Sequence, residues 1–293
     1  MDRQENLRYS SIRHVGIFGI LGNLILLIIK ALAGVVFKSQ ALIADAVNSA
    51  GDIFASCMTY IGNKISSKPV DSTHNFGHGK AEYIFSMLIS LSMIVVAIKL
   101  IYDSIISLTV DDIVFFSWYS VATCLIAIMI KIFLYKYSGF VLKKYNSILV
   151  RANQKDHFND IIITSCTLLA TVLNRFSIFW VDKVVAILIS IYILYVGIRL
   201  FIDSSNVLMD KAVDSVVKEN LEKIILEEEW VKKIDEFYSS PVGDKYYLIL
   251  TVSVDGNLST FESHNLADSL EKKLEKEENI YKTTVHINPV EAE

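Results

Sequence analysis

Long apolar runs separated by short polar stretches fill the first 209 residues of the chain. Most of them are near the ~20 residues that an α-helix needs to cross a bilayer. The fifth is shorter, and it can span the membrane only if its polar lead-in from Leu149 faces protein rather than lipid. We predict six transmembrane helices, over Val15–Val36, Ala41–Ile61, Tyr83–Ile106, Val114–Tyr135, Ile161–Leu173 and Ile178–Phe201.

After residue 209 the pattern becomes that of a small soluble domain. Helical periodicity covers Val213–Glu229 and Thr260–Glu277, and the second of these has a capping residue at Ser259 or Thr260. Alternating apolar residues mark strands over Val231–Tyr238, Lys245–Val254 and Lys282–Ile287, with a turn at Pro241-Val-Gly243. The order α-β-β-α-β predicts a ferredoxin-like α+β sandwich with its helices on one side. We therefore predict two domains, a transmembrane domain over residues 1–209 and a cytoplasmic domain over residues 210–293.

Composition agrees with a polytopic membrane protein that carries a soluble domain. The chain is 53% hydrophobic with a mean hydropathy of +0.43, which is high for a soluble domain. Residues 1–209 hold 18 basic and 13 acidic side chains, whereas residues 210–293 hold 10 basic and 19 acidic ones. The acidic tail argues against nucleic-acid binding, which needs positive charge.

The basic residues predict the orientation in the membrane, because cytoplasmic loops are enriched in lysine and arginine. They gather before the first, between the second and third, between the fourth and fifth, and after the sixth apolar run. They are Arg3, Arg8, Arg13, Lys64, Lys68, Lys80, Lys136, Lys143, Lys144, Arg151, Arg199 and Lys211. Both termini are therefore predicted to be cytoplasmic. Lys30 and Lys99 are expected to extend to the outer interface.

Two apolar runs contain acidic residues at helical spacing. Asp45, Asn48 and Asp52 share one helix face, and Asp156 and Asp160 form a second set four residues apart. A carboxylate at the centre of a spanning helix costs roughly 2.5–3.5 kcal/mol, so such residues are normally paired. A divalent cation suits oxygen ligands, and protons compete with it for the same oxygens. The alternative interpretation is that these polar side chains have a purely structural role and only bridge neighbouring helices.

Four segments together resemble the cation diffusion facilitator family of transporters. They are Ala44-Asp-Ala-x-Asn-Ser-x-x-Asp52, Phe76-Gly-His-Gly-Lys-Ala-Glu82, Arg151-Ala-x-x-x-Asp-x-x-x-Asp160 and Val207-Leu-Met-Asp210. The resemblance covers almost the whole chain. It implies a multi-pass homodimer in the bacterial cell membrane that exports divalent metal from the cytoplasm, usually in exchange for protons.

By the same resemblance, the transport site is Asn48, Asp52, Asp156 and Asp160. Zinc-selective relatives have histidine at the position of Asp156, and histidine or aspartate at that of Asn48. A set of oxygen donors favours a harder ion such as Mn²⁺, and the pattern is similar to that of the bacterial manganese-exporting branch. Asp45 is expected to lie on the exit path or in an outer vestibule. His157 is expected to pack rather than to bind metal.

Two further sites follow from the resemblance. Asp71, His74 and His78 match a metal site in the loop after the second helix, where the two histidines could share an ion if the stretch were helical, which its glycines disfavour. The alternative is a cytoplasmic loop whose histidines only form hydrogen bonds. Lys80 and Asp210 match a charge interlock at the base of the dimer's membrane domains.

In the cytoplasmic domain, zinc-binding relatives have several histidines at a two-metal subunit interface. Leu250 occupies one of the corresponding positions here and cannot bind a metal. A single site that uses Asp235, His264 or His286 stays open. Otherwise the domain serves dimerisation, and its acidity concentrates cations.

The sequence therefore predicts a proton-coupled Mn²⁺ exporter with no cofactor beyond the transported metal. Export of Fe²⁺ or Zn²⁺ is the alternative within the same class. A metal-sensing membrane scaffold that does not transport is the alternative from another class. No nucleophile–base set, phosphate loop or cofactor fingerprint indicates an enzyme.

Overall fold

The computed structural model describes residues 3–36, 40–109, 118–174, 180–243 and 245–290. It consists of two compact units. The first comprises Met1–Pro69 and Ala81–Ser205, and the second comprises Val70–Lys80 and Asn206–Glu293. The loop that follows the second helix thus folds with the C-terminal domain rather than with the helices it connects.

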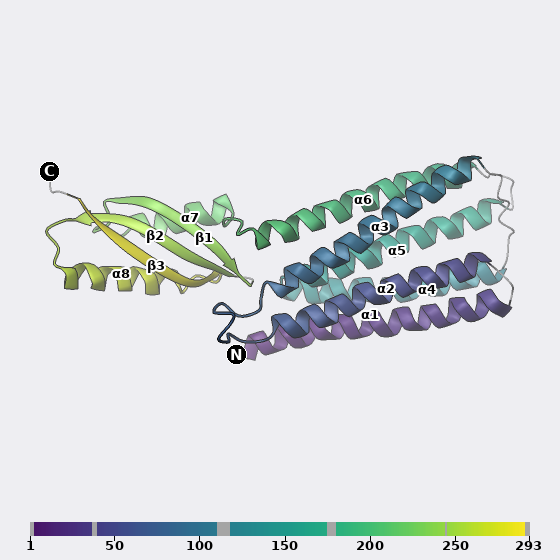
Figure 1. The fold of residues 1–293 in the computed structure, drawn as a ribbon, viewed down its shortest axis with the longest axis horizontal. Helices are drawn as coiled ribbons and strands as arrows, with labels where there is room; N and C mark the ends of the chain where they lie inside the picture. Colours follow the sequence, from purple (N-terminus) through teal and green to yellow (C-terminus); the bar gives the residue numbers. More distant parts are fainter. Residues whose placement is uncertain (1–2, 37–39, 110–117, 175–179, 244, 291–293) are drawn as a thin grey trace. The chain divides into compact units, whose positions relative to one another are not determined.

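Six long helices make up the first unit (Figure 1). They are α1 (Arg3–Val36), α2 (Gln40–Ser66), α3 (Ala81–Thr109), α4 (Trp118–Lys144), α5 (Ile148–Asn174) and α6 (Trp180–Leu208). The shortest have 27 residues, which at 1.5 Å per residue gives about 40 Å and exceeds a hydrocarbon core of about 30 Å. Each of the six helices is longer than its predicted apolar run, because polar residues at one or both of its ends are also helical.

Four of the helices contain apolar stretches long enough to cross a membrane. These stretches are Glu5–Ala33, Ala81–Ile106, Val121–Lys144 and Ser190–Leu208. Within the described residues, α2 and α5 contain no stretch of that length and hydropathy. They are also the helices that carry Asp52, Asp156 and Asp160. The polar character that was expected of the fifth helix alone thus applies to both helices of the site.

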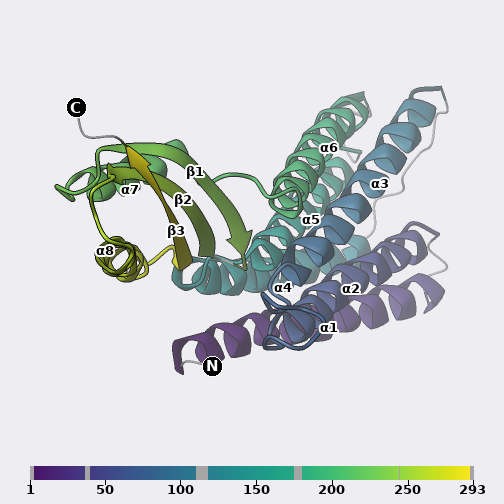
Figure 2. The same ribbon diagram turned by 60° about the vertical axis from the view of Figure 1, so that its left-hand side comes forward.

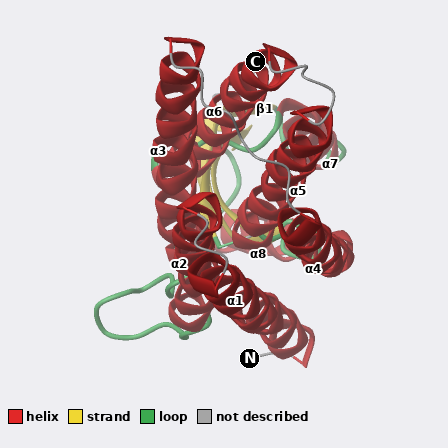
Figure 3. Cartoon of the chain, turned by 90° about the vertical axis from the view of Figure 1, so that its right-hand side faces the viewer, coloured by secondary structure: helices red, strands yellow, loops and turns green. Residues whose placement is uncertain are grey.

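The bundle packs around α2, α3, α5 and α6. Ala55, Ile89, Leu149 and Val196, one from each of these helices, belong to one buried cluster. Viewed along the bundle, α1 lies beside α2, and α4 lies beside α5 (Figure 3). The core therefore places α2 and α5 within reach of each other.

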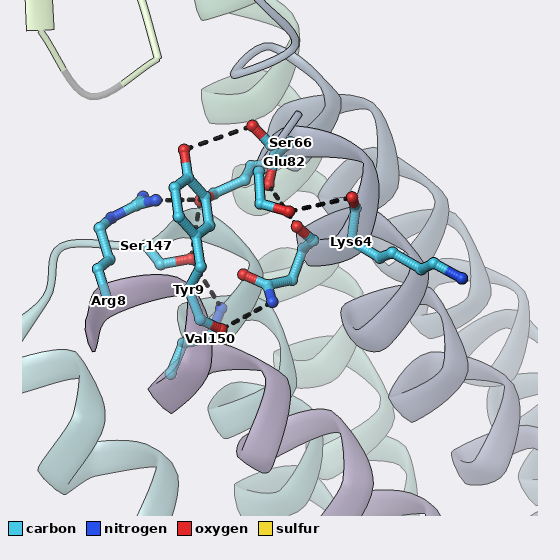
Figure 4. Close-up of polar contacts among 9 residues, drawn as sticks. Arg8, Tyr9, Lys64, Ser66, Glu82, Ser147 and Val150 are labelled. Atoms are coloured by element: carbon cyan, nitrogen blue, oxygen red, sulfur yellow. Dashed lines mark hydrogen bonds and ion pairs between the residues drawn. The ribbon is translucent and has the colours of Figure 1, made fainter. Parts of the chain in front are cut away.

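A polar cluster joins four segments at the end of the bundle where α1 begins (Figure 4). Glu82 at the start of α3 is almost fully buried, and it pairs with Arg8 of α1 at 2.8 Å. The Ser147 hydroxyl, just before α5, donates to the same carboxylate at 2.8 Å. Asn63 of α2 donates to the carbonyl of Tyr9 at 2.8 Å. These contacts tie α1, α2, α3 and the start of α5 together at that end.

The C-terminal domain has the predicted order of elements: α7 (Ser215–Leu226), β1 (Lys233–Val242), β2 (Lys245–Asp255), α8 (Thr260–Leu274) and β3 (Ile280–Val290). The strand order is β1-β2-β3, with β1 and β2 antiparallel and β2 and β3 parallel (Figure 2). Every second residue of β2 from Leu248 to Val254 is buried against α7 and α8. The amphipathic pattern of the sequence thus becomes one helix-covered face of the sheet.

Two local details can be compared with prediction. Ser259 caps α8 in a capping box with Glu262, as expected from the sequence. The turn before β2 is shorter than predicted, because β1 continues through Pro241 and Val242 pairs with Lys245. Gly243 then adopts a positive φ of 67°, which glycine allows without steric cost.

Close approach of α1 to α2 generates a prediction about stability. A methyl group added at Gly16 would lie 2.9 Å from both the Cβ and the backbone nitrogen of Tyr60. We expect Gly16→Ala to lower the melting temperature of the purified protein, because overpacking costs about 1–3 kcal/mol and helix propensity returns only about 1 kcal/mol. Gly51 is the matched control on α2, since no described heavy atom lies within 4 Å of its added methyl group. An equal effect of both substitutions on the melting temperature would contradict this packing.

Candidate metal centre

Three carboxylates from two helices line one small cavity inside the bundle. Asp52 of α2 and Asp160 of α5 are each 9% exposed, and Asp156 lies one turn before Asp160. The cavity has a volume of about 50 Å³. It is lined by Gly51, Asp52, Ser92, Met93, Val96, Asp156, Asn159, Asp160, Ile163 and Ile193. This volume suits one ion with little accompanying water.

A lysine from a third helix reaches the same carboxylates. Lys131 of α4 is 2% exposed, and its ammonium group donates to Asp52 Oδ2 at 2.7 Å. The ammonium also donates to Asp160 Oδ2, so it bridges α2 and α5. Lys131 is absent from the site predicted from sequence, because a single lysine has no spacing signature. A charge in the middle of an apolar helix was the available signal.

Two side chains that line the cavity have buried polar atoms without a protein partner. In the described part of the chain, neither Asp156 Oδ2 nor the amide oxygen and nitrogen of Asn159 makes a hydrogen bond. Buried polar groups are normally satisfied, and a carboxylate most of all. These oxygens fit a cation, which would supply the missing partner. Asn159 adds an amide donor that the sequence did not single out.

His157 lies closer to the site than expected. It is fully buried, as a packing residue would be, yet one of its ring nitrogens lies within 4.8 Å of carboxylate oxygens of Asp156 and Asp160. Neither ring nitrogen has a hydrogen-bond partner among the described residues. The donor set therefore includes one potential nitrogen ligand beside the oxygens.

The outer part of α2 can be compared with prediction only in part. Asp45 and Asn48 fall within α2, but their side chains lie outside the described residues, so both roles stay predictions. Lys30 was expected to extend to the membrane interface, and this is wrong. Its side chain is buried, and its ammonium donates to the Ser49 hydroxyl at 3.1 Å.

The predicted loop residues do come together, although the segment is not helical. The ring of His78 lies 3.5 Å from one oxygen of Asp71, and His74 lies 3.2 Å from the other. The two imidazole rings are 4.3 Å apart between centroids. A turn that uses a positive φ of 73° at Gly77 lies between the histidines, so a glycine turn rather than a helix brings the two rings together.

Local hydrogen bonds prepare Asp71 to bind a cation. The hydroxyl and amide of Thr73 and the amide of His74 donate to its carboxylate, and these bonds hold the pKa of Asp71 below its usual value. The ionised form, which metal binding needs, is therefore favoured. The loop packs within its own unit, since the rings of Phe76 and Tyr247 are 5.8 Å apart.

Lys80 and Asp210 form an ion pair at 2.8 Å within the second unit. Ser240 donates to the same carboxylate, and these two partners lower the pKa of Asp210. The lysine and aspartate side chains are 41% and 56% exposed, so the pair alone contributes little stability. Its role as a dimer interlock stays a prediction.

One chain does not bring the proposed cytoplasmic ligands together. A metal site needs about three His, Cys, Asp or Glu side chains whose ligand atoms lie within 4.8 Å of one another. Among the described residues, no group of this kind contains Asp235, His264 or His286. Asp235 instead accepts hydrogen bonds from Ser253 at 2.6 Å and Asn288 at 3.2 Å. Leu250 is fully buried in the domain core.

Comparisons with known proteins found matches for both structural units of the chain. Residues 16–209 match the family model for the cation efflux transmembrane domain, and residues 213–290 match that for the cytoplasmic domain of cation efflux proteins. The chain is 31% identical over 278 residues to the manganese efflux system protein MneS of Bacillus subtilis, covering 92% of each chain. It is 28% identical over 285 residues to MneP of the same organism, covering 94% of this chain and 96% of MneP. The magnetosome protein MamB of Magnetospira sp. is 28% identical over 262 residues, or 89% of each chain.

The loop geometry generates a prediction about metal content. We expect the double variant Asp71→Asn/His78→Ala to bind about one metal ion per chain fewer than its parent, because it loses two of three ligands. Elemental analysis after equilibration with Co²⁺ measures this, in an Asp160→Asn background that removes binding inside the bundle. His14→Ala is the control, as it removes an exposed histidine of α1. An unchanged metal content would contradict the loop site.

Proposed function

The chain belongs to the cation efflux family, also called cation diffusion facilitators, and on this basis we propose that it is a proton-coupled exporter of Mn²⁺. The observation that carries the proposal is the cavity between α2 and α5, where Asp52, Asp156 and Asp160 meet. Asp156 Oδ2 and the Asn159 amide are buried there without a described protein partner. A divalent cation satisfies the three carboxylates and the Asn159 amide oxygen at once.

The donor set supports Mn²⁺ as the main substrate. Carboxylate and amide oxygens suit harder ions that accept several ligands. Mg²⁺ dehydrates reluctantly and demands near-ideal octahedral geometry, so a cavity of about 50 Å³ disfavours it. Two relatives that match nearly the full chain bear the name of manganese efflux proteins, which supports the same metal.

Transport follows from alternating exposure of this cavity to the two sides of the membrane. In this proposal all six helices span the bilayer, with α2 and α5 shielded from lipid by the other four. Both termini face the cytoplasm, and the C-terminal domain joins two chains as a homodimer. The polar cluster around Glu82 and Arg8 then closes the bundle at its cytoplasmic end.

Proton coupling comes from competition for the same oxygens. A metal ion binds the ionised carboxylates, whereas protons bind the same groups when the metal leaves. If the cavity opens to each side in turn, outward movement of metal is matched by inward movement of protons. No further proton carrier is required.

Zn²⁺ is the second candidate substrate, because one specific observation favours it. His157 places a ring nitrogen within 4.8 Å of carboxylate oxygens of Asp156 and Asp160, and imidazole suits zinc. Zinc sites in proteins combine histidine nitrogen with carboxylate oxygen ligands. Direct comparison of the two metals in one transport assay separates the two substrates.

The first test concerns the site itself. We expect Asp160→Asn to reduce Mn²⁺ uptake into inside-out proteoliposomes by roughly 100-fold or more, since the variant removes a charged ligand from a buried site. Asp103→Asn is the control, because Asp103 is an exposed carboxylate on α3. If Asp160→Asn transported Mn²⁺ at the parental rate, the proposed site would be wrong.

The second test concerns metal choice. We expect Asn48→His/Asp156→His to shift the ratio of Zn²⁺ to Mn²⁺ transport toward zinc by about tenfold or more, because two imidazoles replace two oxygen donors. Uptake of each metal is measured under the same pH gradient. An unchanged ratio would contradict the argument from ligand type, and faster Zn²⁺ than Mn²⁺ transport by the parent would contradict the assignment of Mn²⁺.

A further inference from the structure

We infer that Lys131 is a tethered cation that competes with the transported metal for Asp52 and Asp160. The inference rests on the proposed function, since it assigns a role to a further side chain of the same site. Lys131 comes from α4, a helix that contributes none of the predicted ligands. It therefore adds a separate element to the transport reaction.

The position of the Lys131 ammonium group places it in competition with a metal ion for two carboxylate oxygens. The ammonium group of Lys131 donates to Asp52 Oδ2 at 2.7 Å and to Asp160 Oδ2, and its side chain is 3% exposed. A divalent cation bound by the same two oxygens would lie within about 2–2.5 Å of each. A metal ion bound by these two oxygens would lie within a few ångströms of the ammonium group, and the two positive charges repel each other strongly in a buried site. Metal binding thus favours movement of the ammonium away from at least one carboxylate.

Charge indicates what the competition achieves. Asp52, Asp156 and Asp160 carry a formal charge of −3 when ionised, and the ammonium brings the site to −2. A single divalent cation matches the remaining charge. Without the ammonium, the same three carboxylates would hold the metal in a site of net negative charge, from which release is slower.

The arrangement of partners suits a group that moves rather than a permanent bridge. Lys131 contacts Asp52 and Asp160, whereas Asp156 Oδ2 stays buried without a described partner. One carboxylate oxygen therefore remains available to an arriving ion. The metal can bind Asp156 first and then displace the ammonium from one of the other two carboxylates. In the reverse step, the ammonium returns and helps to expel the metal.

Competition also gives Lys131 a role in the conformation of the bundle. Its two ion pairs connect α4 to α2 and to α5. Displacement of the ammonium by metal breaks at least one of these connections. Metal binding would thus weaken the electrostatic link between α4 and the two helices that form the cavity.

The test measures Mn²⁺ affinity and transport rate in the full-length protein. Free Mn²⁺ is monitored by electron paramagnetic resonance during titration, in a background that carries Asp71→Asn/His78→Ala so that the loop does not contribute. We expect Lys131→Met to bind Mn²⁺ about tenfold or more tightly than its parent, because the competing charge is gone. Under saturating Mn²⁺ its transport rate should fall, since release becomes slow.

Two variants serve as controls. Lys131→Arg keeps a positive charge, and its affinity should stay within about threefold of the parent. Lys136→Met makes the same substitution at an exposed position of α4 and should change neither affinity nor rate. Size-exclusion chromatography and circular dichroism establish that each variant is folded.

The outcomes separate this inference from the proposed function. If folded Lys131→Met binds Mn²⁺ with the parental affinity or more weakly, Lys131 is a structural ion-pair partner and the inference is wrong. If Asp160→Asn binds Mn²⁺ as tightly as the parent, the proposed site itself is wrong and the inference fails with it. Tighter binding by Lys131→Met, lost again in Lys131→Met/Asp160→Asn, supports both.

Discussion

Three carboxylates buried in the middle of an apolar helical bundle are the constraint on which the rest of the structure depends. Each costs roughly 2.5–3.5 kcal/mol at the centre of a membrane, unless a cation or water compensates it. Asp52 and Asp160 obtain part of this compensation from Lys131. Asp156 keeps one oxygen without a described protein partner. The protein therefore tolerates an expensive group that its own side chains satisfy only in part, as a binding site for a cation requires.

This constraint explains why α2 and α5 differ from the other four helices. Apolar stretches of membrane-spanning length occur in α1, α3, α4 and α6 over the described residues. Those helices can face lipid, whereas the polar faces of α2 and α5 need protein contacts. The cluster around Ala55 and Leu149 supplies such contacts from α3 and α6. The positions of polar residues along the chain thus determine which helices can face lipid and which helices form the site.

Much of the fold could be predicted from the sequence, because periodicity decides which residues can be buried. The order of the C-terminal elements and the cap at Ser259 are of this kind. The approach of Asp52 to Asp160 was predicted from helical spacing and family resemblance together. Lys131, Asn159 and His157 were missed as site residues because their roles depend on how α4 and α5 are rotated in the bundle. Sequence spacing within one helix contains no information about that rotation.

The contact between α1 and α2 at Gly16 has a mechanical consequence. A side chain on one helix that meets the backbone of another without a gap opposes sliding along the axis, so these two helices behave as one rigid piece. Asp52 belongs to that piece and Asp160 does not. Gly19 lies as close to Ser56 of α2, so two glycines of α1 lock it against α2. If the proposed opening of the cavity occurs by shear, the α1–α2 pair would then move as one body relative to α5.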